Sequence, residues 1–166
     1  SFGSSDFDFL VNLKADDSYI YVAGNSAGEQ SGDKSEPSYG LRDVWMLKLD
    51  QNGTYIWDKT IGGNNFDMLR KDFIVKEGVI LLPIGSASAA SGLRELPLKG
   101  PADIWVVKLD ENGDVFHQYT LGGAGADSDS DVILYDQNVL LACNSSSDAS
   151  FDKSEDSNGS IDLWLL

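Results

Sequence analysis

The pattern of apolar and polar positions along the chain predicts short β-strands and no helices. Apolar residues recur in runs of about five to seven residues, and polar turns such as Glu77-Gly78 separate the runs. No segment has the period of ~3.6 residues that an amphipathic helix needs. The predicted strands cover residues 9–14, 19–25, 43–49, 54–60, 71–76, 79–85, 103–109, 114–120, 131–135 and 139–144, with another from Asp162 onward.

Two sequence motifs recur along the chain with one period. The segment Asp43–Gly53, DVWMLKLDQNG, returns sixty residues later as Asp103–Gly113, DIWVVKLDENG, and a further copy begins at Asp162 with DLWL. The motif Thr-x-Gly-Gly, at Thr60–Gly63 and Thr120–Gly123, keeps the same spacing. The chain therefore contains an internal repeat of about sixty residues, which is typical of stacked repeat architectures.

The third predicted strand of each repeat requires cover on both faces. Trp45, Leu47 and Leu49 share one face, while Val44 and Met46 are apolar on the other. A single four-stranded sheet cannot cover both faces, whereas neighbouring sheets around an axis can. The predicted fold class is all-β: a partial β-propeller whose blades have four antiparallel strands. A β-sandwich is the structural rival, but it would not demand an internal repeat.

The repeat divides the chain into about three blades, of which the last is incomplete. We expect one domain, 1–166, with blade-repeats at 1–61, 62–121 and 122–166. The third copy stops at Leu166, before the turn and fourth strand that follow in the first two copies. Because propellers close with about four to eight blades, we expect the remaining blades to come from the same or a larger chain. Closure of one ring by several chains is the alternative.

Composition and charge narrow the classes of function. With 12 Lys and Arg against 27 Asp and Glu, the net charge is −15, and such an acidic protein repels the phosphates of nucleic acids and anionic lipids. No apolar run approaches the ~20 residues of a membrane-spanning helix. We therefore expect neither nucleic-acid binding nor membrane insertion.

The residues that most often carry catalysis are expected to be structural. His117 is the only histidine, and it stands where the preceding repeat has Trp57. Cys143, the only cysteine, aligns with Gly24 and Gly85 at a position that favours small side chains. The aspartate that precedes the tryptophan of each repeat is expected to accept hydrogen bonds from loop N–H groups.

The repeated motifs resemble a known family. Asp-hydrophobic-Trp-x-x-Lys-Leu-Asp-x-Asn-Gly, followed by Thr-x-Gly-Gly, is similar to the sixty-residue β-propeller repeat of large Bacteroidota proteins. The segments Ser31–Glu36 and Ser150–Glu155 resemble that family's Asp-Lys-(Ser/Thr)-Glu loop, from which Leu93–Leu96 departs. The resemblance implies export through the type IX secretion system and an extracellular or cell-surface location. It provides no catalytic residues to carry over.

The acidic stretch DSDSD, at residues 127–131, is a candidate calcium site. Asp127, Asp129 and Asp131 occupy positions 1, 3 and 5 of a calcium-type loop, in which carboxylate ligands alternate. However, Val132 stands where such a loop needs glycine, and no glutamate follows at its last position. We therefore favour a solvated acidic loop, with no cofactor and no metal, and keep calcium as the alternative.

The long polar loops are predicted to form the functional surface. Antiparallel strands place the long loops, 26–42, 86–102 and 145–161, on the same face as the Gly-Gly loops, opposite the tight Asp-x-Asn-Gly turns. Binding residues tend to lie on variable loops of a rigid scaffold, and Arg and aromatic side chains most often anchor interfaces. The candidate binding residues on these loops are Tyr39, Arg42, Arg94 and Phe151.

These observations lead to one predicted function and two alternatives. We expect a non-catalytic extracellular or cell-surface module for binding or adhesion, whose partner is a protein or a glycan. The first alternative is a structural component of a larger surface assembly. The second is the scaffold of an enzyme whose active site lies outside this segment.

Overall fold

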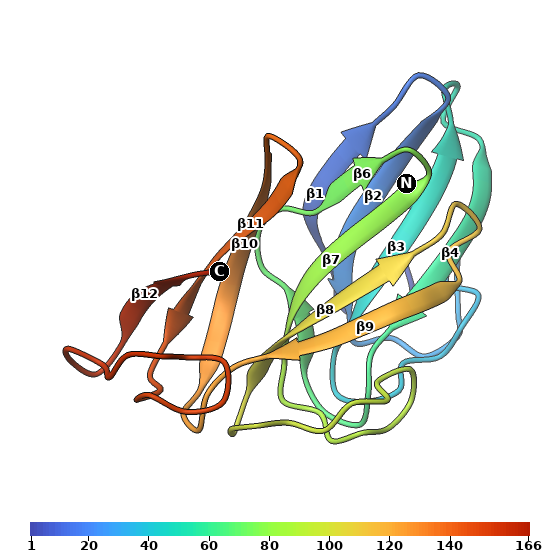
Figure 1. The fold of residues 1–166 in the computed structure, drawn as a ribbon. Helices are drawn as coiled ribbons and strands as arrows, with labels where there is room; N and C mark the ends of the chain where they lie inside the picture. The colour runs from blue at the N-terminus through green and yellow to red at the C-terminus, as the bar shows by residue number, and fades with distance from the viewer.

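The protein is all-β, with twelve strands in three antiparallel sheets and no helix (Figure 1). The structure is a computed structural model that describes residues 1–166. The N-terminal sheet, in the order β1-β2-β3-β4, comprises β1 (Asp8–Ala15), β2 (Tyr19–Ser26), β3 (Asp43–Asp50) and β4 (Tyr55–Ile61). No helix is available that could span a membrane.

The other two sheets repeat this arrangement with changes in the first and last strands. The middle sheet, in the order β5-β7-β8-β9 with β6 also beside β7, comprises β5 (Asp67–Leu69), β6 (Ile74–Lys76), β7 (Val79–Ser86), β8 (Asp103–Leu109) and β9 (Val115–Leu121). The C-terminal sheet, in the order β10-β11-β12, comprises β10 (Asp127–Tyr135), β11 (Asn138–Ser145) and β12 (Asp162–Leu165). The all-β prediction and the positions of most strands are confirmed.

The first strand of each sheet begins earlier than the sequence predicts. In the middle sheet only residues 74–76 of the predicted strand 71–76 form a strand, β6. The prediction is wrong for residues 71–73, because residues 70–73 separate β5 from β6, and Phe73 is buried in the core at that break. In the C-terminal sheet β10 begins at Asp127, inside the predicted acidic loop. Aspartate and serine have low strand propensity, but pairing with β11 holds this polar backbone in the ladder.

An irregularity recurs near the same point of each first strand. The register of β1 shifts between Leu10 and Asn12, and that of β10 shifts between Ser128 and Asp131. Such a bulge bends a strand and redirects its side chains. The break between β5 and β6 lies at the corresponding place in the middle sheet, so all three first strands bend there.

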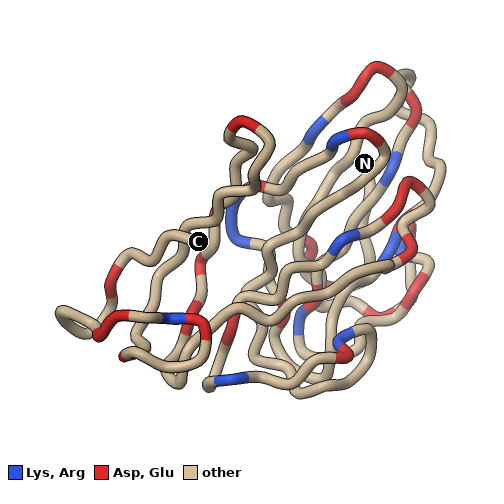
Figure 2. The backbone as a smooth tube through the Cα atoms, viewed as in Figure 1, with Lys and Arg blue, Asp and Glu red and all other residues tan.

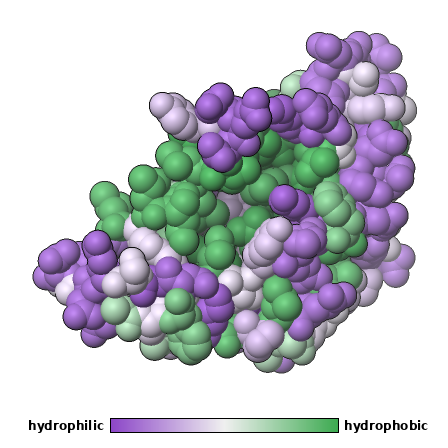
Figure 3. Space-filling view, viewed as in Figure 1, coloured by the Kyte–Doolittle hydropathy of each residue, from purple (hydrophilic) through white to green (hydrophobic).

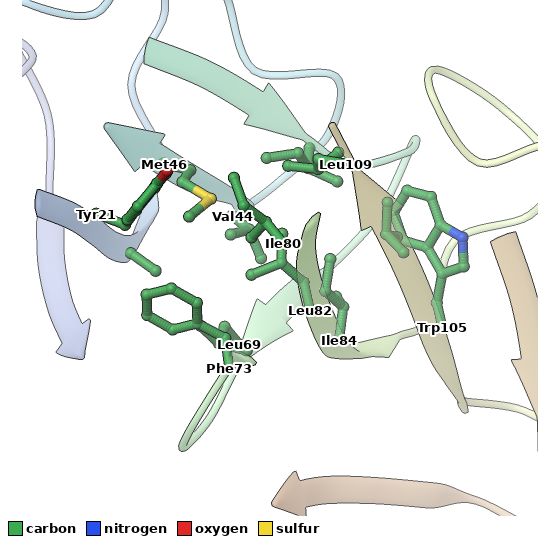
Figure 4. Close-up of a cluster of buried hydrophobic side chains, with 13 residues drawn as sticks. Tyr21, Val44, Met46, Leu69, Phe73, Ile80, Leu82, Ile84, Trp105 and Leu109 are labelled. Atoms are coloured by element: carbon green, nitrogen blue, oxygen red, sulfur yellow. The ribbon is translucent and has the colours of Figure 1, made fainter. Parts of the chain in front are cut away.

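The middle sheet is covered on both faces by the other two sheets. Side chains alternate along a strand, so Trp105 on one face of β8 joins Val44 of the N-terminal sheet in one core cluster (Figure 4). On the opposite face, Ile104 joins Val132 and Leu141 of the C-terminal sheet in a second cluster. The third strand is therefore covered on both sides in the middle sheet, as its apolar pattern predicts.

The larger of these clusters joins the N-terminal and middle sheets. Its 13 buried members are Tyr21, Ala23, Val44, Met46, Ile61, Leu69, Phe73, Ile80, Leu82, Ile84, Trp105, Val107 and Leu109. Removing one such aliphatic side chain from a packed core costs about 2–5 kcal/mol. This contact between sheets therefore contains most of the buried hydrophobic side chains of the chain.

The outer faces of the first and last sheets are apolar and have no sheet beside them. Leu163 of β12 is 90% exposed, although the residue in its ladder position in the middle sheet, Ile104, is fully buried. On the N-terminal sheet, Leu10 and Trp45 line a groove of about 270 Å³. Figure 3 shows further apolar surface in the hollow between the C-terminal sheet and the rest of the molecule.

The three repeated tryptophans occupy equivalent places. Trp45, Trp105 and Trp164 each lie on the third strand, two residues after an aspartate that pairs with the last serine of the second strand. This confirms the repeat alignment along the third strand.

Along the second strand the alignment needs a correction. Cys143 lies opposite the tryptophan of its sheet, as Gly24 does, but the corresponding residue of the middle sheet is Ile84 and not Gly85. The position therefore accepts Gly, Ile and Cys, and the prediction that it favours small side chains does not hold in the middle sheet.

The Asp-x-Asn-Gly segments form tight turns, as predicted. Asp50 Oδ1 accepts hydrogen bonds of 2.8 Å from the backbone N–H groups of Asn52 and Thr54. Gly53 has a φ of 82°, a left-handed conformation that favours glycine. The same contacts recur at Asp110 in the next repeat.

Glycines of the long loops provide a test of the stacking. Gly100 packs so closely that a Cβ would overlap the carbonyl oxygen of Gly125, whereas a Cβ at the equivalent Gly159 would meet nothing within 4 Å. We expect Gly100→Ala to destabilise the protein by about 1–3 kcal/mol, as overpacking does. Gly159→Ala is the matched control and should leave the midpoint of urea denaturation unchanged or slightly raised. Equal losses in both variants would contradict this packing.

Candidate binding surface

The long loops and the Gly-Gly loops lie together on one face of the molecule, at the lower edge of Figure 1. Three contacts between them repeat from sheet to sheet: the side-chain oxygens of Ser31, Ser91 and Ser150 accept hydrogen bonds from the backbone N–H groups of Ser5, Asn64 and Ala124. Each of these serines also forms a backbone bridge to the basic residue three positions later. The base of every long loop is therefore fixed in the same way.

Two of the four predicted binding residues are well exposed on this face. Phe151 is 70% exposed and Tyr39 is 41% exposed. Arg42 is half-buried, and its guanidinium carbon lies 5.3 Å from the centre of the Phe9 ring. The ring of Tyr39 packs against Gly92 of the next long loop, which joins the first two loops into one surface.

Arg94 is not a surface residue, and its prediction as a binding residue is wrong. It is 1% exposed; its Nε donates a hydrogen bond to the carbonyl oxygen of Leu96 and its Nη2 donates one to Thr120. The guanidinium also lies over the ring of Trp105, 5.5 Å from its centre. Sequence alone suggested an exposed arginine because a charged side chain in a polar loop is usually solvated.

The basic residues in the equivalent positions of the other loops are also buried. Lys34 donates to the carbonyl oxygen of Glu36 at 2.7 Å, and Lys153 donates to that of Ser147. Burial lowers the pKa of Lys34 from its ordinary value. One buried cation therefore supports each long loop from below, beneath the exposed side chains.

The candidate calcium loop is not formed. Asp127 is buried and accepts hydrogen bonds from Gly123 N and the Ser147 hydroxyl. Asp129 lies 3.4 Å from Arg70 and Asp131 lies 3.9 Å from Lys71, so the three carboxylates have separate partners. Asp129 has a φ of 53° at the register shift of β10. The strand geometry thus contradicts both the calcium loop and the solvated acidic loop predicted here.

A buried aspartate that the sequence patterns did not predict lies at the start of the first strand in the middle and C-terminal sheets. Asp67 Oδ2 accepts hydrogen bonds of 2.6 Å from Gly63 N and from the Ser88 hydroxyl, and Asp127 makes the equivalent contacts. Asp43, which precedes the tryptophan, accepts from Tyr39 N at 2.5 Å, as predicted for that position. The signal that could have found Asp67 is its constant spacing, four residues after the second glycine of Thr-x-Gly-Gly.

The single histidine and the single cysteine take no part in the hydrogen bonds that repeat between the loops. His117 lies on β9 opposite Lys108, with its ring 4.4 Å from that of Tyr119. Burial raises the pKa of the Cys143 thiol to about 12, so the thiolate is scarce at neutral pH. Neither residue is set up as a nucleophile or a general base.

Comparisons with known proteins assign this chain to no family. No protein-family model matches the sequence. No curated protein matches it either.

The backbone at Phe151 provides a second test. Phe151 has a φ of 49°, whereas the equivalent positions of the other loops hold Gly32 and Gly92, both with a φ of 58°. The left-handed conformation costs a residue with a side chain about 1–2 kcal/mol. We therefore expect Phe151→Gly to raise the free energy of unfolding by about 1 kcal/mol, measured by urea denaturation. A loss of stability would mean that the exposed ring makes contacts that outweigh this strain.

Proposed function

We propose that the chain is a non-catalytic binding module on a partial β-propeller, in which each of the three sheets is one blade. Support comes from the single sixty-residue repeat that builds each sheet and from the face-to-face contacts between consecutive sheets. The apolar outer faces of the first and last sheets would then be covered by the remaining blades of the same or a larger chain. The sequence resemblance to secreted Bacteroidota repeats supports an extracellular or cell-surface location.

The observation that carries this proposal is the contrast between fixed loop bases and varied exposed residues. Hydrogen bonds from Ser31, Ser91 and Ser150 and the buried cations hold the three loops in one conformation. In each long loop, one residue donates its backbone N–H to the aspartate that begins the third strand. This residue differs from loop to loop: it is Tyr39, Lys99 or Asn158. A rigid backbone with variable side chains is the arrangement that recognition surfaces use.

The chemistry of the surface favours a protein or a glycan as partner. Exposed aromatic rings such as those of Tyr39 and Phe151 anchor protein interfaces and also stack on the apolar faces of sugar rings. Figure 2 shows acidic residues spread over all three sheets and their loops. With a net charge of −15, this surface opposes binding to nucleic acid.

A structural role in a larger surface assembly is the second candidate. It is favoured by the exposed apolar side chains of the C-terminal sheet, including Leu163 and Leu165. Apolar patches of this kind mark contacts with other proteins. In that case the long-loop face would be a surface without a ligand.

The binding test uses surface substitutions on the two faces of the scaffold. Wild-type protein is screened against immobilised bacterial and host polysaccharides and extracellular-matrix proteins, and affinities are measured by biolayer interferometry. We expect Tyr39→Ala and Phe151→Ala each to weaken binding about tenfold or more, because aromatic anchors dominate interfaces. Gln51→Ser and Glu111→Ser, in the opposite turns, are the controls and should change affinity by less than about twofold.

Two outcomes would contradict the binding proposal. Loss of affinity in the turn variants with full affinity in the loop variants would place the site on the opposite face. Absence of binding to every immobilised probe would favour the structural role. Single substitutions are preferable to exchange of a whole loop, because Ser88 and Arg94 are buried and their removal would disturb the fold.

A further inference from the structure

Two pairs of aspartates lie at the boundaries between consecutive sheets. Asp43 of β3 is near Asp67 of β5, and Asp103 of β8 is near Asp127 of β10; all four are 0% exposed. At both boundaries the third-strand aspartate lies against the first glycine of Thr-x-Gly-Gly, and a Cβ at Gly62 would overlap Asp43 Oδ1. A Cβ at Gly122 would overlap Asp103 Oδ1 and would stand 3.0 Å from Asp127 Oδ2.

Each of these carboxylates is satisfied on one oxygen only. The Oδ2 atoms accept hydrogen bonds from loop N–H groups or serine hydroxyls. The Oδ1 atoms of Asp43, Asp67, Asp103 and Asp127 are buried and have no hydrogen-bond partner. An ionised carboxylate can only accept hydrogen bonds, so two such oxygens cannot satisfy each other, and a buried unsatisfied acceptor costs about 1–3 kcal/mol.

We propose that each aspartate pair shares one proton taken up from solvent. One carboxylic acid of each pair is then neutral and faces the ionised carboxylate of the other aspartate across the boundary between two sheets. Two neighbouring buried carboxylates disfavour double ionisation and commonly share a proton. The repeat places one such pair at each of the two boundaries, close to the loops that form the candidate binding surface.

The buried cations near the aspartate pairs are too few to balance every buried carboxylate in the middle sheet. Lys34 faces Asp43 and also Asp8, Glu29 and Asp58, while Arg94 faces both Asp67 and Asp103. On the far side of the second pair, Asp127 and Lys153 both act on Cys143, and Lys153 also acts on Asp162. In the middle sheet one buried cation thus stands against two buried aspartates.

The raised pKa values of Asp43 and Asp103 agree with their burial next to another carboxylate. Burial raises the pKa of Asp43 to about 6, and the neighbouring Asp67 carboxylate adds to that effect, against the N–H groups of Tyr39 and Gly40. Burial likewise raises the pKa of Asp103, with a contribution from Asp127, while Arg94 acts in the opposite direction.

The shared proton makes the contact between sheets dependent on pH. Because the pKa of Asp43 is raised in the folded state, folding takes up a proton, and stability increases as the pH falls through about 6 toward the unfolded value near 3.8. Below that value, aspartates whose pKa is lowered by hydrogen bonds, such as Asp58 and Asp162, lose their stabilising contribution. The optimum of stability is therefore expected between about pH 4 and pH 6.

Infrared spectroscopy tests the proton directly. At about pH 5.5, wild-type protein should show a carboxylic acid C=O band that the Asp43→Asn/Asp103→Asn double variant lacks, and the band should disappear at about pH 8. Each single variant should remove part of it. Identical spectra of wild type and double variant at pH 5.5 would overturn the proposal.

Thermal denaturation provides the second readout. Asparagine supplies the N–H donor without a proton, so the double variant should melt at least about 2–4 °C higher than wild type at pH 8 and lose the gain on acidification. Asp17→Asn, which removes one carboxylate from an exposed loop, is the control and should keep the wild-type pH profile.

Two further results would also overturn the shared proton. A wild-type melting temperature that rises with calcium at pH 8 and falls with a chelator would assign the free oxygens to a cation. A melting temperature that does not change between about pH 5 and pH 8 would show that the pairs do not titrate in this range.

Discussion

Each third strand carries apolar side chains on both of its faces, and neither face can be left in water without cost. Full burial of a Val, Leu or Ile side chain contributes about 1.5–3 kcal/mol, so such a sheet gains stability from a neighbour on each face. In the middle sheet, Val107 and Ile104 of the third strand are buried on opposite faces. The close packing of Gly100, the bends in the first strands and the fixed loop bases all accompany this stacking.

The polar interior of the loop face is built by the same repetition. Lys34, Arg94 and Lys153 lie under the three long loops, and the boundary aspartates lie beside them. Buried charges are costly unless they have partners, and here their partners are mostly backbone groups of the loops. The conformation of each loop therefore depends on the packing of the sheets. Substitution of an exposed residue at a loop tip leaves these buried contacts unchanged.

Most of the strands and all of the tight turns follow from local sequence, because alternation and Asp-x-Asn-Gly act over a few residues. The errors fall where distant contacts outweigh local preference. Asp67 and Asp127 begin strands despite low propensity, because partners from other segments bond them. Arg94 is buried because Thr120 and a carbonyl oxygen accept hydrogen bonds from its guanidinium. Of the predicted binding residues, Tyr39 and Phe151 lie exposed on the loop face, and their role stays a prediction.

The boundary between two sheets takes one aspartate from each of two consecutive repeats. Asp43 and Asp103 open third strands, whereas Asp67 and Asp127 open the first strands that follow. Any sixty-residue unit therefore carries both halves of a junction, one for the sheet before it and one for the sheet after it. Recombination between copies in the gene, in register with the period, would add or remove whole sheets while every remaining junction stays complete. An insertion out of register would separate an aspartate from its partner, so the packing of the sheets favours changes of length by whole repeats.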